Sequence, residues 1–291
     1  MLGAVALVAA DHAAAELLSV FVAPNSGMAT QTCSGVSGPI TSPHDPVRTD
    51  NACTDFFGTV GTSSGSAISA AGHVGASAHA DSHNGNSLVS GIGANAIYSD
   101  FLTFTSSSPG LQSTSASVNL ALDGIFDNSG PFSVGQLTLK LYLGSSTVPI
   151  GELDMLNGGV TTINGLSVTS GALGPVTNAQ LLSSSVNLGL NTPIFFEIDL
   201  LVGAGASGPG SHALIDFGSS SVKLVTGSDA FVLPAGVTVN AGDYLVNNRF
   251  IDPLTPPTGN VPEPASLALT LAALALVIAT RRRGARNRLV S

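Results

Sequence analysis

Residues 137–143 read L-T-L-K-L-Y-L, with leucine at every second position and threonine, lysine and tyrosine between. Side chains of a β-strand point alternately to opposite faces, so this stretch predicts a strand with one apolar and one polar face. Residues 194–200, I-F-F-E-I-D-L, alternate almost as well, with apolar side chains at the even positions. Both stretches predict strands that lie between a hydrophobic core and solvent.

Similar short runs extend from this stretch toward both ends of the chain, at residues 116–122, 181–190, 213–217, 222–225 and 244–246. Turn-forming sequences separate several of them, namely Asp123-Gly124, Asn157-Gly158, Asn164-Gly165 and Gly208-Pro209-Gly210. No stretch outside the two ends sustains the apolar period of a helix. The pattern predicts an all-β body over residues 16–251, a β-sandwich or jelly-roll-like domain.

The composition is typical of an exported all-β protein. Hydrophobic residues make up 44% of the chain, which is too many for a wholly disordered protein. Charged residues make up only 9%, against about 25% in an average soluble domain. The chain can therefore form a substantial core from small aliphatic residues.

The net charge of −9 is unevenly distributed. Five of the nine basic residues follow position 280, whereas residues 16–260 contain 4 basic and 16 acidic residues. Nucleic-acid binding requires clustered lysine and arginine to displace counterions from phosphate. The acidic body therefore excludes nucleic acid as a partner, and its charge favours solubility or weak cation binding.

The two cysteines, Cys33 and Cys53, lie in a polar, loop-like region. An oxidising, exported environment would join them in a structural disulfide. A ring of this size stabilises a fold by about 3 kcal/mol in the chain-entropy model. Two free thiols are the alternative, while a zinc site would need further ligands that this region lacks.

Residues 1–15 resemble the end of a secretory signal peptide. An apolar run at residues 2–10 precedes Ala13 and Ala15, small residues at the −3 and −1 positions of a cleavage site. The run lacks a positively charged beginning, so we expect the true start to lie upstream. An ordinary N-terminal core segment is the alternative.

The C-terminal end has three parts in a fixed order. Val261-Pro262-Glu263-Pro264 precedes an uncharged apolar segment, residues 265–280, which is followed by Arg281, Arg282 and Arg283. As a helix the apolar segment is about 24 Å long, short of the roughly 30 Å hydrocarbon core, and snorkelling arginines can cover the difference. The arginines would hold their end in the cytoplasm and leave the body outside. Proline-rich residues 252–260 predict a linker between body and anchor.

This end resembles the PEP-CTERM sorting signal of Gram-negative bacteria, over residues 261–288. The resemblance implies that an exosortase, a membrane-embedded transpeptidase-like enzyme, recognises Pro262, Glu263 and Pro264 and cuts near them. Arg281, Arg282 and Arg283 would form the membrane stop. It also implies an association with exopolysaccharide and biofilm. An ordinary tail anchor is the alternative.

Residues 71–83 are the best candidates for chemistry. In a strand His73, His79, Asp81 and His83 share one face, and a metal could gather two of the last three. Small apolar residues alternate with them, so the solvent face of a half-buried strand is the favoured interpretation, with no metal.

Two other motifs predict no site. Residues 61–65, G-T-S-S-G, match a nucleophile elbow, but no strand-then-helix pattern surrounds them. Residues 123–130 offer oxygen ligands without the spacing of a calcium-binding EF-hand loop, so a plain turn is favoured there.

Together these observations predict a non-catalytic, exported surface or extracellular-matrix protein that needs no cofactor. It would be anchored transiently in the inner membrane and then retained near exopolysaccharide. An adhesin or carbohydrate-binding module is one alternative. The chain has no tryptophan and only three tyrosines, however, so it has few aromatic side chains on which a sugar could stack. An extracellular hydrolase or metal-dependent enzyme is the other.

Overall fold

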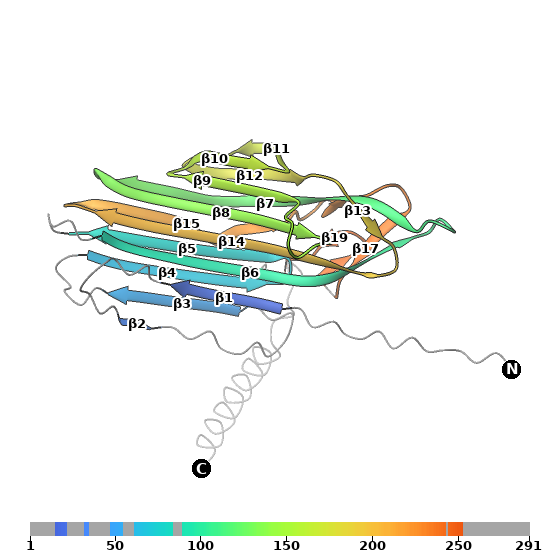
Figure 1. Cartoon of the computed structure of the whole chain (residues 1–291), viewed down its shortest axis with the longest axis horizontal. Coiled ribbons are helices and arrows are strands. Elements are labelled where there is room, and N and C mark those ends of the chain that lie inside the picture. The colour runs from blue at the N-terminus through green and yellow to red at the C-terminus, as the bar shows by residue number, and fades with distance from the viewer. Residues whose placement is uncertain are drawn as a thin grey trace, which may run out of the picture. The chain divides into compact units, whose positions relative to one another are not determined.

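The computed structural model describes residues 15–21, 32–34, 47–54, 61–83, 89–242 and 244–252. Residues 1–14 of the predicted signal segment (1–15), residues 253–260 of the predicted linker (252–260) and the sorting segment at 261–288 lie outside these residues. Residue 15 of the predicted signal segment is the first residue of a described strand. The described part of the chain is all-β and contains no helix, as the sequence predicts. Its strands form two large sheets and one short hairpin (Figure 1).

The first sheet has the strand order β1-β6-β14-β8-β9-β10, with β17 also paired to β6. Its strands are β1 (Ala15–Phe21), β6 (Val89–Ser106), β14 (Pro193–Ser207), β8 (Phe132–Leu143), β9 (Gly151–Leu156), β10 (Gly159–Asn164) and β17 (Val237–Asn240). All of these pairs are antiparallel. The sheet thus joins strands that are distant in sequence.

The second sheet has the order β11-β12-β7-β15-β5-β4-β3-β2, and β13 and β16 also pair with β7. Its strands are β11 (Leu166–Ala172), β12 (Val176–Ser183), β7 (Ser113–Ser129), β15 (Ser211–Leu224), β5 (His73–Ser82), β4 (Gly61–Ala70), β3 (Val47–Thr54), β2 (Thr32–Ser34), β13 (Val186–Gly189) and β16 (Phe231–Val232). The chain passes between the sheets repeatedly, from β5 to β6, β6 to β7, β7 to β8 and β14 to β15.

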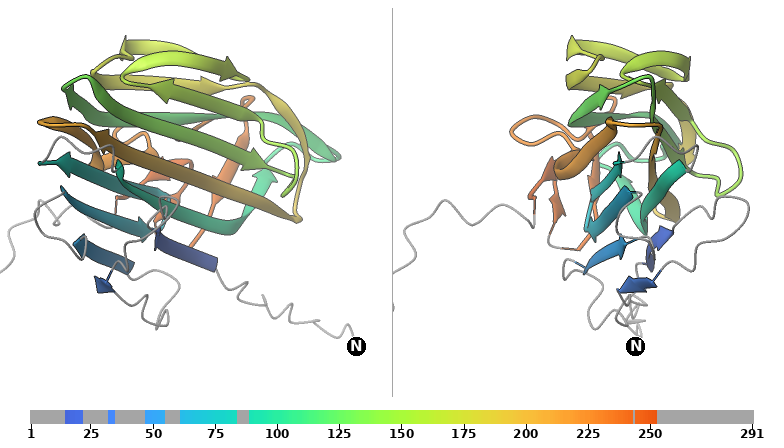
Figure 2. Two further views of the ribbon diagram at one scale, coloured as in Figure 1. Left: turned by 60° about the vertical axis from the view of Figure 1, so that its left-hand side comes forward. Right: turned by 90° about the vertical axis from the view of Figure 1, so that its left-hand side faces the viewer.

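The two sheets pack face to face over one hydrophobic core, in a β-sandwich-like arrangement (Figure 2). Both sheets contribute to this core, for example through Leu139 of β8, Ile198 of β14, Ala78 of β5 and Ile215 of β15. Burying such aliphatic side chains stabilises the fold by about 25 cal/mol for each Å² removed from water. The prediction of an all-β body whose strands have one buried and one exposed face is confirmed.

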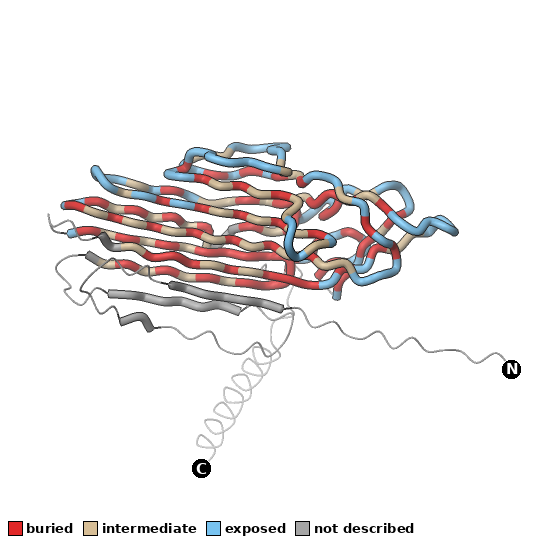
Figure 3. The backbone as a smooth tube through the Cα atoms, viewed as in Figure 1, coloured by how far each residue is buried: buried red, intermediate tan, exposed pale blue. Residues whose placement is uncertain are grey.

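Alternation along the strands sets which side chains enter the core. In β8 the four leucines at 137, 139, 141 and 143 are buried, and Thr138, Lys140 and Tyr142 between them are half-buried on the outer face. β14 repeats the pattern with Phe196, Ile198 and Leu200 inside. The same alternation of buried and less buried residues is visible along most central strands (Figure 3).

One predicted turn is wrong. Asp123-Gly124 lies inside the continuous strand β7, and the oxygen-rich residues 123–129 belong to that strand as well. Gly124 is needed there because a Cβ at this position would lie only 2.5 Å from Cγ and Cε1 of Phe217. The glycine therefore admits an aromatic ring from β15 and makes no turn.

Other boundaries also differ from the sequence prediction. Residues 213–217 and 222–225 belong largely to one strand, β15, with a register shift between Phe217 and Val222. Residues 181–190 divide between β12 and β13. The Asn157-Gly158 turn is confirmed, since both residues have positive φ (49° and 77°) between β9 and β10.

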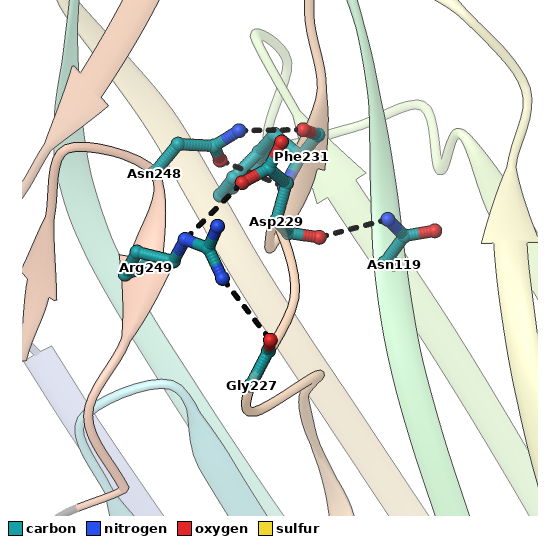
Figure 4. Close-up of polar contacts among 6 residues, drawn as sticks. All are labelled: Asn119, Gly227, Asp229, Phe231, Asn248 and Arg249. Atoms are coloured by element: carbon teal, nitrogen blue, oxygen red, sulfur yellow. Dashed lines mark hydrogen bonds and ion pairs between the residues drawn. The ribbon is translucent and has the colours of Figure 1, made fainter.

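The C-terminal hairpin of the body, β18 (Leu245–Val246) and β19 (Arg249–Phe250), is held by polar contacts (Figure 4). The buried Asn248 side chain accepts a hydrogen bond from the Phe231 amide (2.9 Å) and donates one to its carbonyl (2.7 Å). Arg249 contacts the Asp229 carboxylate (3.4 Å) and donates to the Gly227 carbonyl (3.0 Å). The Asp229 carbonyl accepts from Asn119 of β7 (2.9 Å), which ties the hairpin region to the second sheet.

Asp252 is the last described residue and belongs to the body. Its side chain is 1% exposed and bonds Lys223 Nζ (2.8 Å) and His73 Nδ1 (3.3 Å). His73, expected on the solvent face of β5, is buried for this reason. Residue 252, the first residue of the predicted linker, is therefore bonded to the body, and residues 253–260 of that predicted linker lie outside the described residues.

Candidate metal centre

Two neighbouring strands in the middle of the second sheet bring three metal-binding side chains together. β5 carries His79 and Asp81 on its outer face, as the sequence alternation predicts. The antiparallel register places His212 of β15 directly opposite Asp81, and Leu214 opposite His79. Residues opposite or diagonal across a strand pair lie close enough for their side chains to touch.

The three side chains are in mutual contact. Asp81 Oδ2 lies 2.9 Å from His79 Nε2, and Asp81 Oδ1 lies 2.6 Å from His212 Nδ1. The two imidazole nitrogens themselves are 3.3 Å apart. One ligand atom from each residue lies within 4.8 Å of the others. The side chains of His79, Asp81 and His212 are 32%, 27% and 30% exposed, so an ion could reach them from solvent.

His83 is not part of this cluster. It is exposed just after the last residue of β5, whereas His79 and Asp81 meet His212. Sequence reasoning missed His212, although Ala213, Ile215 and Phe217 mark its strand and put His212 on the polar face. What the alternation could not reveal is that β15 pairs with β5, about 130 positions earlier in the chain.

Hydroxyl groups flank the cluster on both sides. The register places Thr62 of β4 opposite Asp81, Ser64 of β4 opposite His79, and Ser129 of β7 opposite His212. The G-x-S-x-G match at residues 61–65 lies in strand β4, without the strand-turn-helix context of a nucleophile elbow.

A second polar group of side chains lies on the outer face of the first sheet. Asp199 accepts a hydrogen bond from Asn95 (3.1 Å), and Lys140 lies 3.6 Å from Glu152. Burial raises the pKa of Asp199, although Asn95 and Lys140 act in the opposite direction. Burial and the neighbouring Asp199 raise the pKa of Glu197. Lys140 and Asp199 are cross-strand partners, so this group contributes to pairing between β8 and β14.

Two depressions on the body lie away from the histidine cluster. One is lined by small and apolar residues of β6, β8 and β14, including Gly91, Gly203 and Val134. The other contains Asp123, Asn178 and Asp216 from β7, β12 and β15. Neither is lined by tyrosine or phenylalanine, so neither has the aromatic surface on which sugars usually stack.

The two cysteines meet in the backbone register. Cys33 of β2 pairs directly with Cys53 of β3 in an antiparallel ladder. Antiparallel partners have Cα atoms about 4.5 or 5.5 Å apart, and both values fall in the disulfide range of about 4.4–6.8 Å. The register is thus compatible with the predicted disulfide, while the two side chains lie outside what the structure describes.

Comparisons with protein-family models, with curated proteins and with solved structures give no match. The resemblance to a sorting signal therefore rests on residues 261–288 alone. The residues that carry it, Pro262, Glu263, Pro264 and Arg281 to Arg283, lie outside the described residues. Within the described ranges, no helix is long and apolar enough to span a membrane.

Proposed function

We propose that this chain is a non-catalytic, exported surface or extracellular-matrix protein, sorted by its C-terminal end. The observation that carries the proposal is the order of Pro262-Glu263-Pro264, the apolar residues 265–280 and the arginines from Arg281 onward. An exosortase-type enzyme is the partner that this order implies. The exported body would then remain at the cell surface or in exopolysaccharide.

The chemistry of the end supports this order of events. Pro262 and Pro264 lack backbone N–H groups and disfavour helix formation, which favours an extended chain at the place where the processing enzyme would bind. The apolar segment holds the chain in the inner membrane, and the arginines keep its far end in the cytoplasm. A signal peptide at residues 1–15 would start the export of the body.

Nine residues separate the last described residue of the body from the sorting motif. Asp252, the last described residue, is bonded to Lys223 and His73. Residues 253–261 separate it from Pro262. A proline-rich chain of this length would reach up to about 28 Å if it were extended, at about 3.1 Å per residue. This reach supports cleavage near the membrane without disturbing the folded domain.

The surface of the body supports a non-catalytic function. The side chains of His79, Asp81 and His212 are 32%, 27% and 30% exposed, and other residues line the two depressions described above. Enzymes usually bind substrates in concave sites from which water can be excluded. The acidic body and its serine- and threonine-rich faces suit a solvated environment such as hydrated polysaccharide.

The test is to replace Pro262, Glu263 and Pro264 together by alanine in the native host. We expect full-length protein to accumulate in the inner membrane, because the enzyme no longer recognises the chain. Fractionation followed by immunoblotting measures the ratio of full-length to shortened protein. The matched control, Pro256→Ala with Pro257→Ala, also removes two prolines and should be processed like the wild type.

Unchanged release of a shortened protein from the triple variant would contradict sorting through this motif. Equal retention of the triple variant and the Pro256/Pro257 control would also contradict it. In that case an extended linker, and not recognition of Pro-Glu-Pro, would govern release.

A further inference from the structure

We propose that His79, Asp81 and His212 bind one zinc-like divalent transition-metal ion, which cross-links β5 to β15 on the outer face of the second sheet. The inference is independent of how the chain is exported. It rests on the ligand types, on the distances between them and on a conflict among their hydrogen bonds.

The ligand set suits zinc. Two imidazole nitrogens and one carboxylate oxygen are a recurring three-ligand set for Zn²⁺, with water in the fourth position. Ligand atoms at about 2.0–2.1 Å from a tetrahedral ion lie about 3.3–3.4 Å from each other. The distance between His79 Nε2 and His212 Nδ1, 3.3 Å, already has this value.

The carboxylate needs only a small adjustment. Its oxygens lie 2.9 Å from His79 Nε2 and 2.6 Å from His212 Nδ1, both shorter than the ligand spacing around a tetrahedral ion. Asp81 is partly exposed, so a small change in its side-chain torsion angles, within the same rotamer, can move the carboxylate by less than about 1 Å toward solvent. No movement of the strands is required.

Without a metal, at most two of the three contacts in the cluster can be hydrogen bonds. An ionised Asp81 only accepts hydrogen bonds, so His79 Nε2 and His212 Nδ1 must both carry protons to bond its two oxygens. The 3.3 Å contact between the two nitrogens then joins two donors and is not a hydrogen bond. If one nitrogen instead accepts from the other, it turns a lone pair toward the carboxylate.

A bound cation removes this conflict. Both nitrogen lone pairs and the carboxylate then point at one positive charge, and every contact becomes attractive. The serine and threonine hydroxyls that the register places beside the three ligands, at Thr62, Ser64 and Ser129, are suitable second neighbours for a metal-bound histidine or water.

The same chemistry argues against hard cations. Ca²⁺ takes 6–8 oxygen ligands and Mg²⁺ prefers oxygen ligands in octahedral geometry, whereas this cluster offers one carboxylate and two nitrogens. Imidazole suits Zn²⁺ and its first-row neighbours. Because the ligands come from the directly paired strands β5 and β15 and are partly exposed on the outer face of the sheet, the ion would cross-link these two strands.

The experiment uses the full chain in detergent, freed of metal with a chelator and titrated with Zn²⁺. Because the ion binds the folded state, at 100-fold excess over its Kd it should raise the midpoint of thermal unfolding by about 5–10 °C. Calorimetry should give one Zn²⁺ per chain, and Ca²⁺ and Mg²⁺ should produce no shift. Co²⁺ in place of Zn²⁺ should show the intense visible bands of a tetrahedral site.

His212→Gln and His79→Gln should each weaken Zn²⁺ binding by more than about tenfold, the loss already typical of disturbing a second-shell partner. The matched control is His83→Gln, which removes the exposed histidine that directly follows β5 and lies outside the cluster, and this variant should bind like the wild type. Far-UV circular dichroism and the Co²⁺ spectrum separate loss of the site from loss of the fold. Absence of stoichiometric Zn²⁺, or equal binding by the His212→Gln and His83→Gln variants, would overturn the proposal.

Discussion

Asp100 shows how a single residue can hold two parts of this body together. It is buried on β6, and its Oδ2 accepts hydrogen bonds from Tyr98 (3.1 Å) and from Tyr244 (2.6 Å). Tyr244 precedes the C-terminal hairpin, so this contact links the hairpin region to the first sheet. Removing one partner from a buried hydrogen bond to a charged group usually costs about 1–3 kcal/mol.

Tyr244→Phe should therefore lower the free energy of unfolding by about 1–3 kcal/mol, because Asp100 loses its shorter hydrogen bond. Denaturant unfolding at pH 7 measures this change. The matched control is Tyr142→Phe on the outer face of β8, where the residue is half-buried, and we expect a change below about 0.5 kcal/mol. Equal stability of the Tyr244→Phe variant and the wild type would contradict the linking role.

The same residue predicts an alkaline effect. Burial, with Tyr98 and Asp100 nearby, raises the pKa of Tyr244 well above 10.0. Above pH 10 the unfolded chain therefore releases this proton while the folded chain keeps it, and stability falls as pH rises. Below pH 10 both states hold the proton and this group contributes no slope. The fall above pH 10 should be shallower in Tyr244→Phe, and an equal slope would contradict the assignment.

At the level of strands, one glycine decides how β7 and β15 pack. Gly124→Ala should lower stability by about 1–3 kcal/mol, because its Cβ would overlap the Phe217 ring in a filled core. Gly203→Ala in β14 is the matched control, since its nearest neighbour would be the Ile92 carbonyl oxygen at 3.8 Å. The control should keep or raise stability. Thermal unfolding compares the two, and equal effects would show that Phe217 gives way.

The predicted disulfide would join β2, at the edge of the second sheet, to β3 beside it. Mass spectrometry of the exported protein should show peptides joined through Cys33 and Cys53, because their backbone positions are cross-strand partners. Reduction should release the two peptides and lower the thermal midpoint, since the closed ring contributes about 3 kcal/mol in the chain-entropy model. Two thiols that alkylate in the undenatured exported protein would contradict the bond.

At the scale of the whole molecule, the last described residue of the body is held in place by side-chain contacts. Asp252 is bonded to β5 through His73 and to β15 through Lys223, the two strands that also carry the proposed metal site. The proposed metal ion would join the same two strands to which Asp252 is bonded. This would reinforce the place where the body ends, which fits the proposed anchoring of the chain by its C-terminal end.

The sequence by itself determined the all-β class, the leucine face of β8 and the Asn157-Gly158 turn, because alternation and turn chemistry are local properties of the chain. It also contains the order of Pro-Glu-Pro, apolar segment and arginines on which the proposed sorting rests. Only the tertiary structure decided that Gly124 admits Phe217, that Asp252 buries His73, and that His212 and not His83 meets Asp81. Each of these depends on which distant strands pair, and pairing is set by how two whole sheets bury their apolar faces, which no short stretch encodes.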